Sequence, residues 1–231
     1  TKTRMKKILI ISYYWPPNTG SGVQRWLKFS KYLKKNKWDP IIVTPENPYS
    51  ELSDEKLIED IEDINVLKLP IWEPYLLKDK IFGKSKKSQN SGLVSKDKSI
   101  KDFCLNWIRG NIFIPDPKKY FIKPTTKSLI KYIEENKINH IITTGPPHSM
   151  HLIGLGIKKR FNQIKWIADF RDPWSKLDLL DDFHLTKRTR FKHIQLEKQV
   201  LENSDLVLTV SEKWAKDFKN LGSSNVQIIT N

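Results

Sequence analysis

Two carboxylates and an arginine lie within four consecutive positions of the chain, in the run Asp169-Phe-Arg-Asp-Pro-Trp174. Asp169 and Asp172 could orient hydroxyl groups or take part in acid–base chemistry, and Arg171 could neutralise a phosphate. The same residue types could instead form an internal network of ion pairs that only stiffens a loop. The run is therefore a candidate catalytic or acceptor-binding loop with a structural alternative.

A pair of glycines, in Gly20-Ser-Gly22, marks a second candidate site. The apolar residues 8–11 favour a buried strand that ends before two prolines, and a helical pattern starts just after the glycines. Glycine has no Cβ, so this backbone could turn tightly and approach a ligand. The unpaired amides at the helix start would favour an anion such as a phosphate. A turn that needs glycine for its geometry alone is the structural alternative.

This loop departs from two common phosphate-binding motifs. The dinucleotide fingerprint has a third glycine three residues after the second, a position that Arg25 occupies here. The pattern of a Walker loop is absent as well. The pair of glycines is therefore a general anion-binding signal and does not specify a nucleotide.

Two histidines follow a third turn, Thr144-Gly-Pro-Pro147, and His148 would stand at the start of a helix. The spacing of His148 and His151 could suit a metal, but no third ligand with convincing spacing accompanies them. We therefore expect no metal here, and a hydrogen-bonding or substrate-contacting role for His148. Cys104 has no evident base beside it, so we expect a small buried hydrophobic residue rather than a nucleophile.

Alternating strand and helix patterns position these three loops. The alternation predicts a Rossmann-like α/β fold, a doubly wound and mostly parallel sheet with helices on both faces. Ligands of such a sheet collect beyond the carboxyl ends of the strands, where all three loops lie. The predicted strands are 8–12, 40–44, 64–69, 138–143, 164–168, 206–210 and 226–230, and the predicted helices are 22–35, 53–61, 124–136, 147–160, 185–203 and 211–220.

The composition suits one large soluble domain, with 231 residues of which 38% are hydrophobic. No apolar run approaches the ~18 residues that would span a bilayer, and no signal peptide is evident. We therefore expect a cytoplasmic protein. Residues 1–4 precede Met5 and are expected to be vector or upstream residues, with the domain at 5–231.

The formal net charge of +15 would attract polyanions, namely nucleic acid, anionic lipid or phosphorylated substrates. The lysines are spread over helix faces, and no zinc-finger spacing, ribonucleoprotein motif or basic zipper is evident, so nucleic acid is not expected. A generic lysine-rich surface is the alternative to a specific anionic partner.

The alternation of strands and helices breaks down in the middle of the chain. Residues 83–98 are rich in Lys, Ser, Asn and Gly, and we expect them to be mobile. The segments on either side combine apolar residues, tryptophans and lysines, as an interfacial membrane contact requires. The favoured interpretation, however, is that Trp107, Ile108, Phe113 and Ile114 pack on the core.

These features together resemble the N-terminal, acceptor-side domain of retaining glycosyltransferases with the GT-B fold, the large family of bacterial lipopolysaccharide, mannosyl and sucrose-phosphate transferases. The resemblance covers nearly the whole chain. The segments that carry it are Tyr13-Tyr-Trp-Pro-Pro17, Gly20-Ser-Gly-Val-Gln-Arg-Trp-Leu-Lys-Phe29, Trp38-Asp-Pro-Ile-Ile-Val-Thr44, Asp169-Phe-Arg-Asp-Pro-Trp174, Glu202-Asn-Ser-Asp-Leu-Val-Leu-Thr-Val-Ser211 and Val226-Gln-Ile-Ile-Thr-Asn231. The last of these resembles the crossing into a second Rossmann-like domain, so we expect one half of a two-domain enzyme without its C-terminal donor-binding domain.

The resemblance implies transfer of a sugar from a nucleotide-diphosphate sugar to a glycan or lipid-linked acceptor, with retention at the anomeric carbon and no metal or other cofactor. It assigns the donor diphosphate to Gly20, Ser21 and Gly22. The family commonly has His-Asp where this chain has Arg171-Asp172. The role of that histidine is therefore lost, altered or passed to His148, because arginine cannot serve as a neutral base.

The expected catalytic residues are thus Arg171, Asp172 and His148. The expected acceptor pocket consists of Tyr14, Trp15, Asn18, Asp169 and Trp174. In the family, the main cationic ligands of the donor and a pair of glutamates belong to the second domain, so this chain alone is expected to be inactive.

The basic surface and the irregular middle segment suggest that the domain docks on an anionic membrane to reach a lipid-linked acceptor. Two other functions remain as alternatives. One is a stand-alone Rossmann-like module that binds a phosphorylated small molecule, and the other is a basic nucleic-acid-binding protein.

Overall fold

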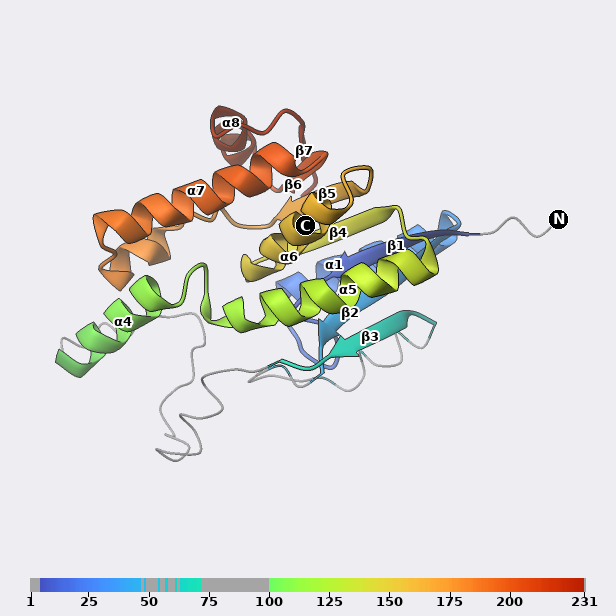
Figure 1. Ribbon diagram of the computed structural model, residues 1–231, viewed down its shortest axis with the longest axis horizontal. Helices are drawn as coiled ribbons and strands as arrows, with labels where there is room; N and C mark the ends of the chain where they lie inside the picture. Colours follow the sequence, from blue (N-terminus) through green and yellow to red (C-terminus); the bar gives the residue numbers. More distant parts are fainter. Residues whose placement is uncertain are drawn as a thin grey trace.

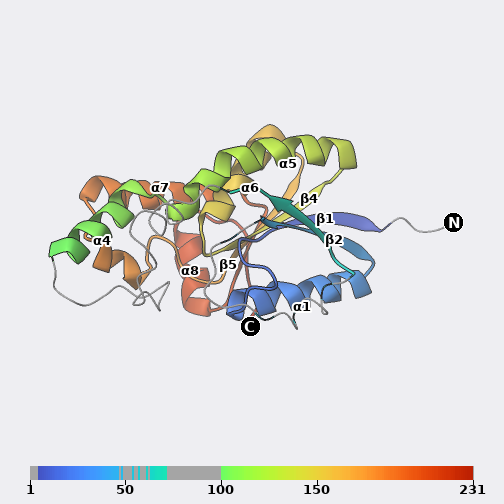
Figure 2. The same ribbon diagram turned by 90° about the horizontal axis from the view of Figure 1, so that it is seen from below.

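The computed structural model describes residues 5–46, 48, 54, 57, 61, 63–71 and 100–230. They form an α/β domain in which one sheet lies between helices on both faces (Figure 1 and Figure 2). The expected vector residues 1–4, the segment 83–98 and most of the helix predicted at 53–61 lie outside the described residues.

The sheet has seven strands in the order β3-β2-β1-β4-β5-β6-β7, and every neighbouring pair is parallel. The predicted Rossmann-like, doubly wound sheet is therefore confirmed, and it is entirely rather than mostly parallel. All seven predicted strands are present within two residues of their predicted ends. They are β1 Lys6–Ile11, β2 Trp38–Pro45, β3 Asn65–Leu69, β4 His140–Gly145, β5 Lys165–Phe170, β6 Leu206–Thr209 and β7 Val226–Ile228.

Five of the predicted helices are also confirmed within two residues: α1 Ser21–Lys35, α5 Ile122–Asn136, α6 Ser149–Arg160, α7 Lys187–Asn203 and α8 Glu212–Asn220. Figure 2 shows α1 and α5 on opposite faces of the sheet. Within the described ranges, three further elements were not predicted, the helix α4 Ile100–Ile112 and the short 3₁₀ helices η1 Pro117–Phe121 and η2 Asp178–Phe183.

Alternate side chains of β1 pack in two separate cores, one on each face of the sheet. Leu9 and Ile11 pack in the core that contains Leu129 of α5. Ile8 and Ile10 pack in the second core with Trp26 of α1. Successive side chains of a strand point to opposite faces, so a strand buried on both faces must be apolar throughout. This requirement explains why the apolar runs located the strands so closely.

The interpretation that the middle segment packs on the core is wrong for Trp107 and Ile108, whose residues are 39% and 38% exposed on α4. Cys104, expected to be buried, is exposed on the same helix. The segment was correctly recognised as apolar and aromatic, but the helix α4 that it forms contacts only part of the domain, so its residues do not all reach a core. None of the helices in the described ranges is long and apolar enough to cross a membrane.

The strand order creates one switch point. From β1 the chain proceeds to β2 and β3 on one side, and β4 lies on the other side of β1, paired through Leu9↔Ile141 and Ile11↔Thr143. Connections from β1 and β4 therefore leave in opposite directions along the sheet. The crevice between their carboxyl ends is where doubly wound sheets bind ligands.

Helix α6 approaches the sheet closely at Gly154, and this contact can be tested. A Cβ on Gly154 would lie 2.6 Å from the Trp166 ring of β5, whose side chain is fully buried. We expect Gly154→Val to lower the free energy of unfolding by roughly 2 kcal/mol, since overpacking a core typically costs ~1–3 kcal/mol. Chemical denaturation monitored by circular dichroism measures the change.

Ser128→Val on the exposed side of α5 is the matched control. It should lower the free energy of unfolding by less than about 1 kcal/mol, the scale of helix propensity alone. Equal effects of the two substitutions would show that the Gly154–Trp166 contact is not tightly packed.

Candidate functional site

The three loops singled out in the sequence follow β1, β4 and β5, which are neighbours in the sheet. Their carboxyl ends meet at one edge, and the loops therefore share one end of the domain. The site consists of the start of α1 after the glycine loop, the 145–148 turn before α6 and the 169–174 loop.

Among the residues that the structure describes, no side chain caps the start of α1. Its N-cap is Gly20, with φ 125° and ψ 167°, and no side-chain capping bond and no acidic residue in the first turn are present. The amides of Val23 and Gln24 donate to the Gly20 carbonyl at 3.1 and 3.2 Å. The positive φ selects glycine, because a Cβ would be strained there. The helix start is thus open to an anion.

The start of α6, by contrast, is already occupied by a carboxylate of the protein. Asp116 accepts hydrogen bonds from the Ser149 amide at 2.8 Å and from the Ser149 hydroxyl at 2.7 Å, and also from the Lys118 amide at 2.9 Å. Burial raises the pKa of Asp116, although these hydrogen bonds lower it. Of the helices that follow β1 and β4 directly, α1 has no side-chain cap among the described residues, whereas α6 has one.

Arg171 places a positive charge directly against the glycine loop. A Cβ on Gly22 would lie only 2.0 Å from Nη1 of Arg171, so the guanidinium occupies the space that a side chain would need. Its Nη2 donates to the Pro146 carbonyl at 2.5 Å. Burial lowers the pKa of Arg171, but the carboxylates of Asp169 and Asp172 raise it. Arginine remains protonated at neutral pH, so the site holds a fixed cation.

Asp169 is fully buried and holds α1 to the sheet. Its Oδ1 accepts from Nη2 of Arg25 at 2.9 Å, and its Oδ2 accepts from Nε1 of Trp26 at 2.7 Å and from the Thr144 hydroxyl at 2.9 Å. Nε of Arg25 donates to the same oxygen at 3.3 Å. The ion-pair interpretation of this loop therefore holds for Asp169, but its partner is Arg25 rather than Arg171.

Arg25 also holds the chain that leaves the last strand. Its Nη1 donates to the carbonyls of Ile229 and Thr230 at 3.0 and 3.4 Å. One guanidinium thus joins α1, β5 and the residues after β7. A buried arginine needs this many acceptors, because an unpaired buried charge is costly.

Behind Arg171, buried aromatic and histidine rings are stacked. His148 lies parallel to Trp174, with ring centroids 5.1 Å apart and an angle of 2°, and His151 stacks on Phe170 at 4.2 Å. Gly145 makes room for both histidines, since its Cβ would lie 2.7 Å from Nε2 of His151. Burial is the main cause of a His148 pKa of about 3, and it holds the pKa of His151 well below its ordinary value. Both rings are therefore neutral at physiological pH.

The 169–174 loop is fixed from behind by α7. Glu197 accepts from the backbone amides of Trp174 and Ser175 at 3.1 and 3.0 Å, and Nε1 of Trp174 donates to Nδ1 of His193 at 3.0 Å. Burial raises the pKa of Glu197 and lowers that of His193 to about 4. The loop that carries Arg171 is thus held rigidly.

The predicted site residues are brought to one end of the domain but differ in exposure. Arg171, Asp172 and Tyr14 are half-buried, and Gly20 is exposed. His148, Trp15, Asn18, Asp169 and Trp174 are buried, so their roles in catalysis or acceptor binding remain predictions. Burial raises the pKa of Asp172, which Arg171 opposes. Within the described ranges, no three His, Cys, Asp or Glu residues group as a metal site.

Sequence reasoning missed the two residues that organise the site from other elements. Arg25 was noted as the residue in place of a third glycine. The helical pattern also predicted Arg25 on the outer face of its helix together with the neighbouring lysines, which is wrong, because its side chain is buried against Asp169. Glu197 was predicted only as part of a helix. The available signal for Arg25 was its position directly before Trp26, one turn into a helix whose apolar face includes that tryptophan. No local pattern marks Glu197, because its partners lie more than 20 residues away.

The fold and the site define a doubly wound α/β domain with a guanidinium beside an uncapped helix start at its switch point. No protein-family model and no curated protein matches the chain. The chain is similar over 98% of its length to a sucrose-phosphate synthase from Thermosynechococcus elongatus, with 13% identity, a TM-score of 0.49 and 89% of that chain covered. It is also similar over 98% to a glycosyltransferase from Rickettsia africae ESF-5, with 14% identity, a TM-score of 0.49 and 43% of that chain covered.

The chain thus spans less than half the length of the second of these proteins. Both similarities concern the course of the backbone at low sequence identity. A function for this chain therefore has to be argued from its own residues.

The buried Arg25–Asp169 pair predicts a large effect on stability. Asp169→Ala should lower the free energy of unfolding by about 3–5 kcal/mol, because it leaves the buried Arg25 charge without its carboxylate partner. Arg160→Ala is the control, since the Arg160–Glu134 pair is exposed on both sides and such pairs contribute about 0–1 kcal/mol. Chemical denaturation of both variants gives the comparison, and similar losses would rule out the central role of Asp169.

The buried histidines predict loss of stability in mild acid. In the unfolded chain, His148 and His193 bind protons below a pH of about 6.5, whereas in the folded chain their pKa values are about 3 and about 4. Protons therefore favour unfolding between these values, and each histidine can cost about 2 kcal/mol at a pH near 5. The raised pKa values of Asp116 and Glu197 have the opposite effect on stability, because the folded chain then holds protons that the unfolded chain has released. This effect is confined to pH values near and above the ordinary carboxyl pKa.

His148→Phe should flatten this dependence, because phenylalanine keeps the stack on Trp174 without a titrating group. Denaturation at several pH values between 7 and 5 measures the slope, which is proportional to the protons taken up on unfolding. An unchanged slope in His148→Phe would contradict the assignment.

Proposed function

We propose that this chain is the acceptor-side domain of a glycosyltransferase that moves a sugar from a nucleotide-diphosphate sugar to a glycan or lipid-linked acceptor, with retention at the anomeric carbon. Two separate arguments support the proposal. The sequence resembles that domain over nearly its whole length, and the glycine loop provides a place for the donor diphosphate.

The single observation that carries the proposal is the contact of Arg171 with Gly22 at the open start of α1. A guanidinium and free helix amides converge on one loop, and that loop lies at the switch point between β1 and β4. Charge-assisted hydrogen bonds from arginine and amides at a helix start suit a phosphate oxygen. A diphosphate placed here would contact Gly20, Ser21 and Gly22.

The chemistry we propose is electrostatic. When the bond from the anomeric carbon to the diphosphate breaks, negative charge develops on the diphosphate, and Arg171 and the α1 amides are already in place to stabilise it. The oxygen of the acceptor hydroxyl forms its bond to the anomeric carbon on the same face of the sugar, and the hydroxyl proton passes to the oxygen of the leaving diphosphate. Asp172 is the carboxylate of the loop that remains partly accessible, so it is the group that could orient this hydroxyl.

The remaining catalytic residues have supporting positions in this proposal. His148 is neutral and stacked on Trp174, so it would fix the loop that carries Arg171. In the family that the sequence resembles, further cationic ligands of the donor come from a second domain. We therefore propose that this chain binds donor diphosphates without turning them over.

Isothermal titration with uridine, guanosine and adenosine diphosphate sugars and with inorganic pyrophosphate tests the site. We expect Arg171→Gln to weaken binding of the sugar nucleotide that the chain prefers by about tenfold or more, since a hydrogen bond to a charged group contributes roughly 1.5–3 kcal/mol. Gly22→Ala should weaken it as well, because the new methyl group displaces the guanidinium.

Lys28→Gln is the matched control, because it removes the same charge from the exposed side of α1. Equal affinities of the wild-type chain and Arg171→Gln, or no binding of any of these compounds, would refute the proposed donor site. Pyrophosphate that binds as tightly as every sugar nucleotide would favour a module for phosphorylated small molecules instead.

A further inference from the structure

Helix α4 carries an apolar stripe that the described part of the domain does not cover. Leu105, Ile108 and Ile112 follow one another at spacings of three and four residues, and they are 52%, 38% and 50% exposed. On a helix with 3.6 residues per turn, such positions share one face. Three large aliphatic residues in a row on one exposed face are unusual for a surface that only meets water.

The opposite face of α4 packs against the rest of the domain. A Cβ on Gly110 would lie 2.6 Å from Phe183 and from Leu185, so the helix backbone packs closely on η2 and the residues after it. The Phe103 ring lies 4.6 Å from the His184 ring. The helix is thus held by one side, and its apolar stripe points away from η2.

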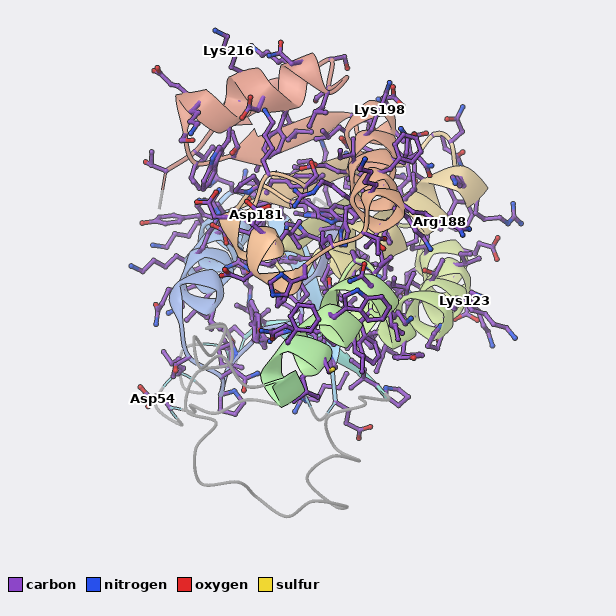
Figure 3. All side chains as sticks on the ribbon, turned by 90° about the vertical axis from the view of Figure 1, so that its left-hand side faces the viewer. Asp54, Lys123, Asp181, Arg188, Lys198 and Lys216 are labelled. Atoms are coloured by element: carbon purple, nitrogen blue, oxygen red, sulfur yellow. The ribbon has the colours of Figure 1, made fainter. Side chains whose placement is uncertain are left out.

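Basic side chains lie on one side of α4. Figure 3 looks onto α4 and shows the labelled Lys123 of α5 and Arg188 of α7 on the same side of it. Lys123, Arg188 and Lys192 are exposed, and none of them forms an ion pair with the described residues. The acidic residues of η2 are Asp178, Asp181 and Asp182, and all three are exposed. The labelled Asp181 lies on the other side of α4 in Figure 3, and it is paired with Arg190 at 2.6 Å.

Lys119 of η1 connects the basic residues to the apolar stripe. Its Nζ donates to the Ile112 carbonyl at 2.8 Å, directly at the end of the stripe. Partial burial lowers the pKa of Lys119, and the charge of Lys192 lowers it further. Two like charges are therefore held near each other beside the apolar residues, and an anion between them would relieve their repulsion.

We propose that α4 lies in the interface of an anionic lipid bilayer, with Leu105, Ile108 and Ile112 in the acyl boundary and Lys119, Lys123 and Arg188 at the lipid phosphates. An amphipathic helix binds such an interface through its apolar area and through attraction to anionic headgroups. Binding of this kind does not require sugar transfer, and it can be measured without any sugar nucleotide.

Charge complementarity selects the bilayer over a second copy of the chain. A symmetric pair of copies would bring two identical basic rims together, which is repulsive. A stable interface between proteins also buries about 800 Å² on each partner, more than three aliphatic side chains provide. A lipid surface with negative headgroups can bury the apolar stripe and also neutralise the basic residues beside it.

The test uses Cys104, which is the one cysteine of the sequence and is exposed on α4 beside Leu105. The full chain is labelled there with a polarity-sensitive fluorophore and mixed with phosphatidylcholine vesicles, with or without about 30% phosphatidylglycerol. We expect a blue shift and brighter emission with the anionic vesicles only, and a matching loss of unlabelled chain from the supernatant on sedimentation. Added salt should reduce both signals.

Three variants separate the contributions. Leu105→Asp should weaken vesicle binding by about tenfold or more, since it removes an apolar side chain and adds a repelled charge. Lys123→Gln should weaken it by about fivefold, the effect of one basic residue near an anionic surface. Tyr32→Asp on α1, where the tyrosine is 60% exposed, is the control and should bind as the wild type does.

Several results would overturn the proposal. These are equal binding to neutral and anionic vesicles, wild-type binding by Leu105→Asp, or a dimer in sedimentation velocity that Ile108→Asp abolishes. Binding to duplex DNA in place of vesicles would also overturn it. Circular dichroism confirms that each variant is folded, and because no sugar nucleotide is present, the outcome is independent of the donor site.

Discussion

The buried carboxylate of Asp169 is the interaction on which the site depends. It stands at the end of β5 and accepts hydrogen bonds from Arg25 and Trp26 of α1 and from Thr144 of β4. A carboxylate without solvent has to be neutralised by nearby donors, and here the donors come from both sides of the switch point. This requirement fixes the direction in which α1 leaves the glycine loop, and therefore where its free amides point.

The other ionisable groups near the loop are arranged so that one accessible positive charge remains beside those amides. Asp116 satisfies the start of α6, and Glu197 holds the backbone of the 169–174 loop. His148 and His151 are buried and neutral. Arg171 is left in contact with Gly22, in surroundings of low polarity that strengthen its attraction to an anion. The anion site that we propose therefore depends on the assembled loops and not on the net charge of +15.

The sequence predicted the fold closely but the site only in outline. Strands buried on both faces must be apolar throughout, so the sheet and its order of loops could be derived from local patterns. The Arg25–Asp169 pair spans 144 residues, and no local pattern states which arginine meets which aspartate. For α4, spacing alone could not distinguish a helix covered by a core from one with an open face, and Trp107 and Ile108 proved to be exposed.

The hold of Arg25 on the Ile229 and Thr230 carbonyls has a mechanical consequence. Backbone carbonyls cannot rotate away as side chains do, so a pull on the chain beyond β7 acts on the guanidinium and, through it, on Asp169, as well as on the hydrogen bond from the Ile229 amide to the Thr209 carbonyl. Such a pull would therefore act on α1, the helix that begins at the glycine loop. The glycine loop and the path of the chain after β7 are thus connected through the side chain of Arg25.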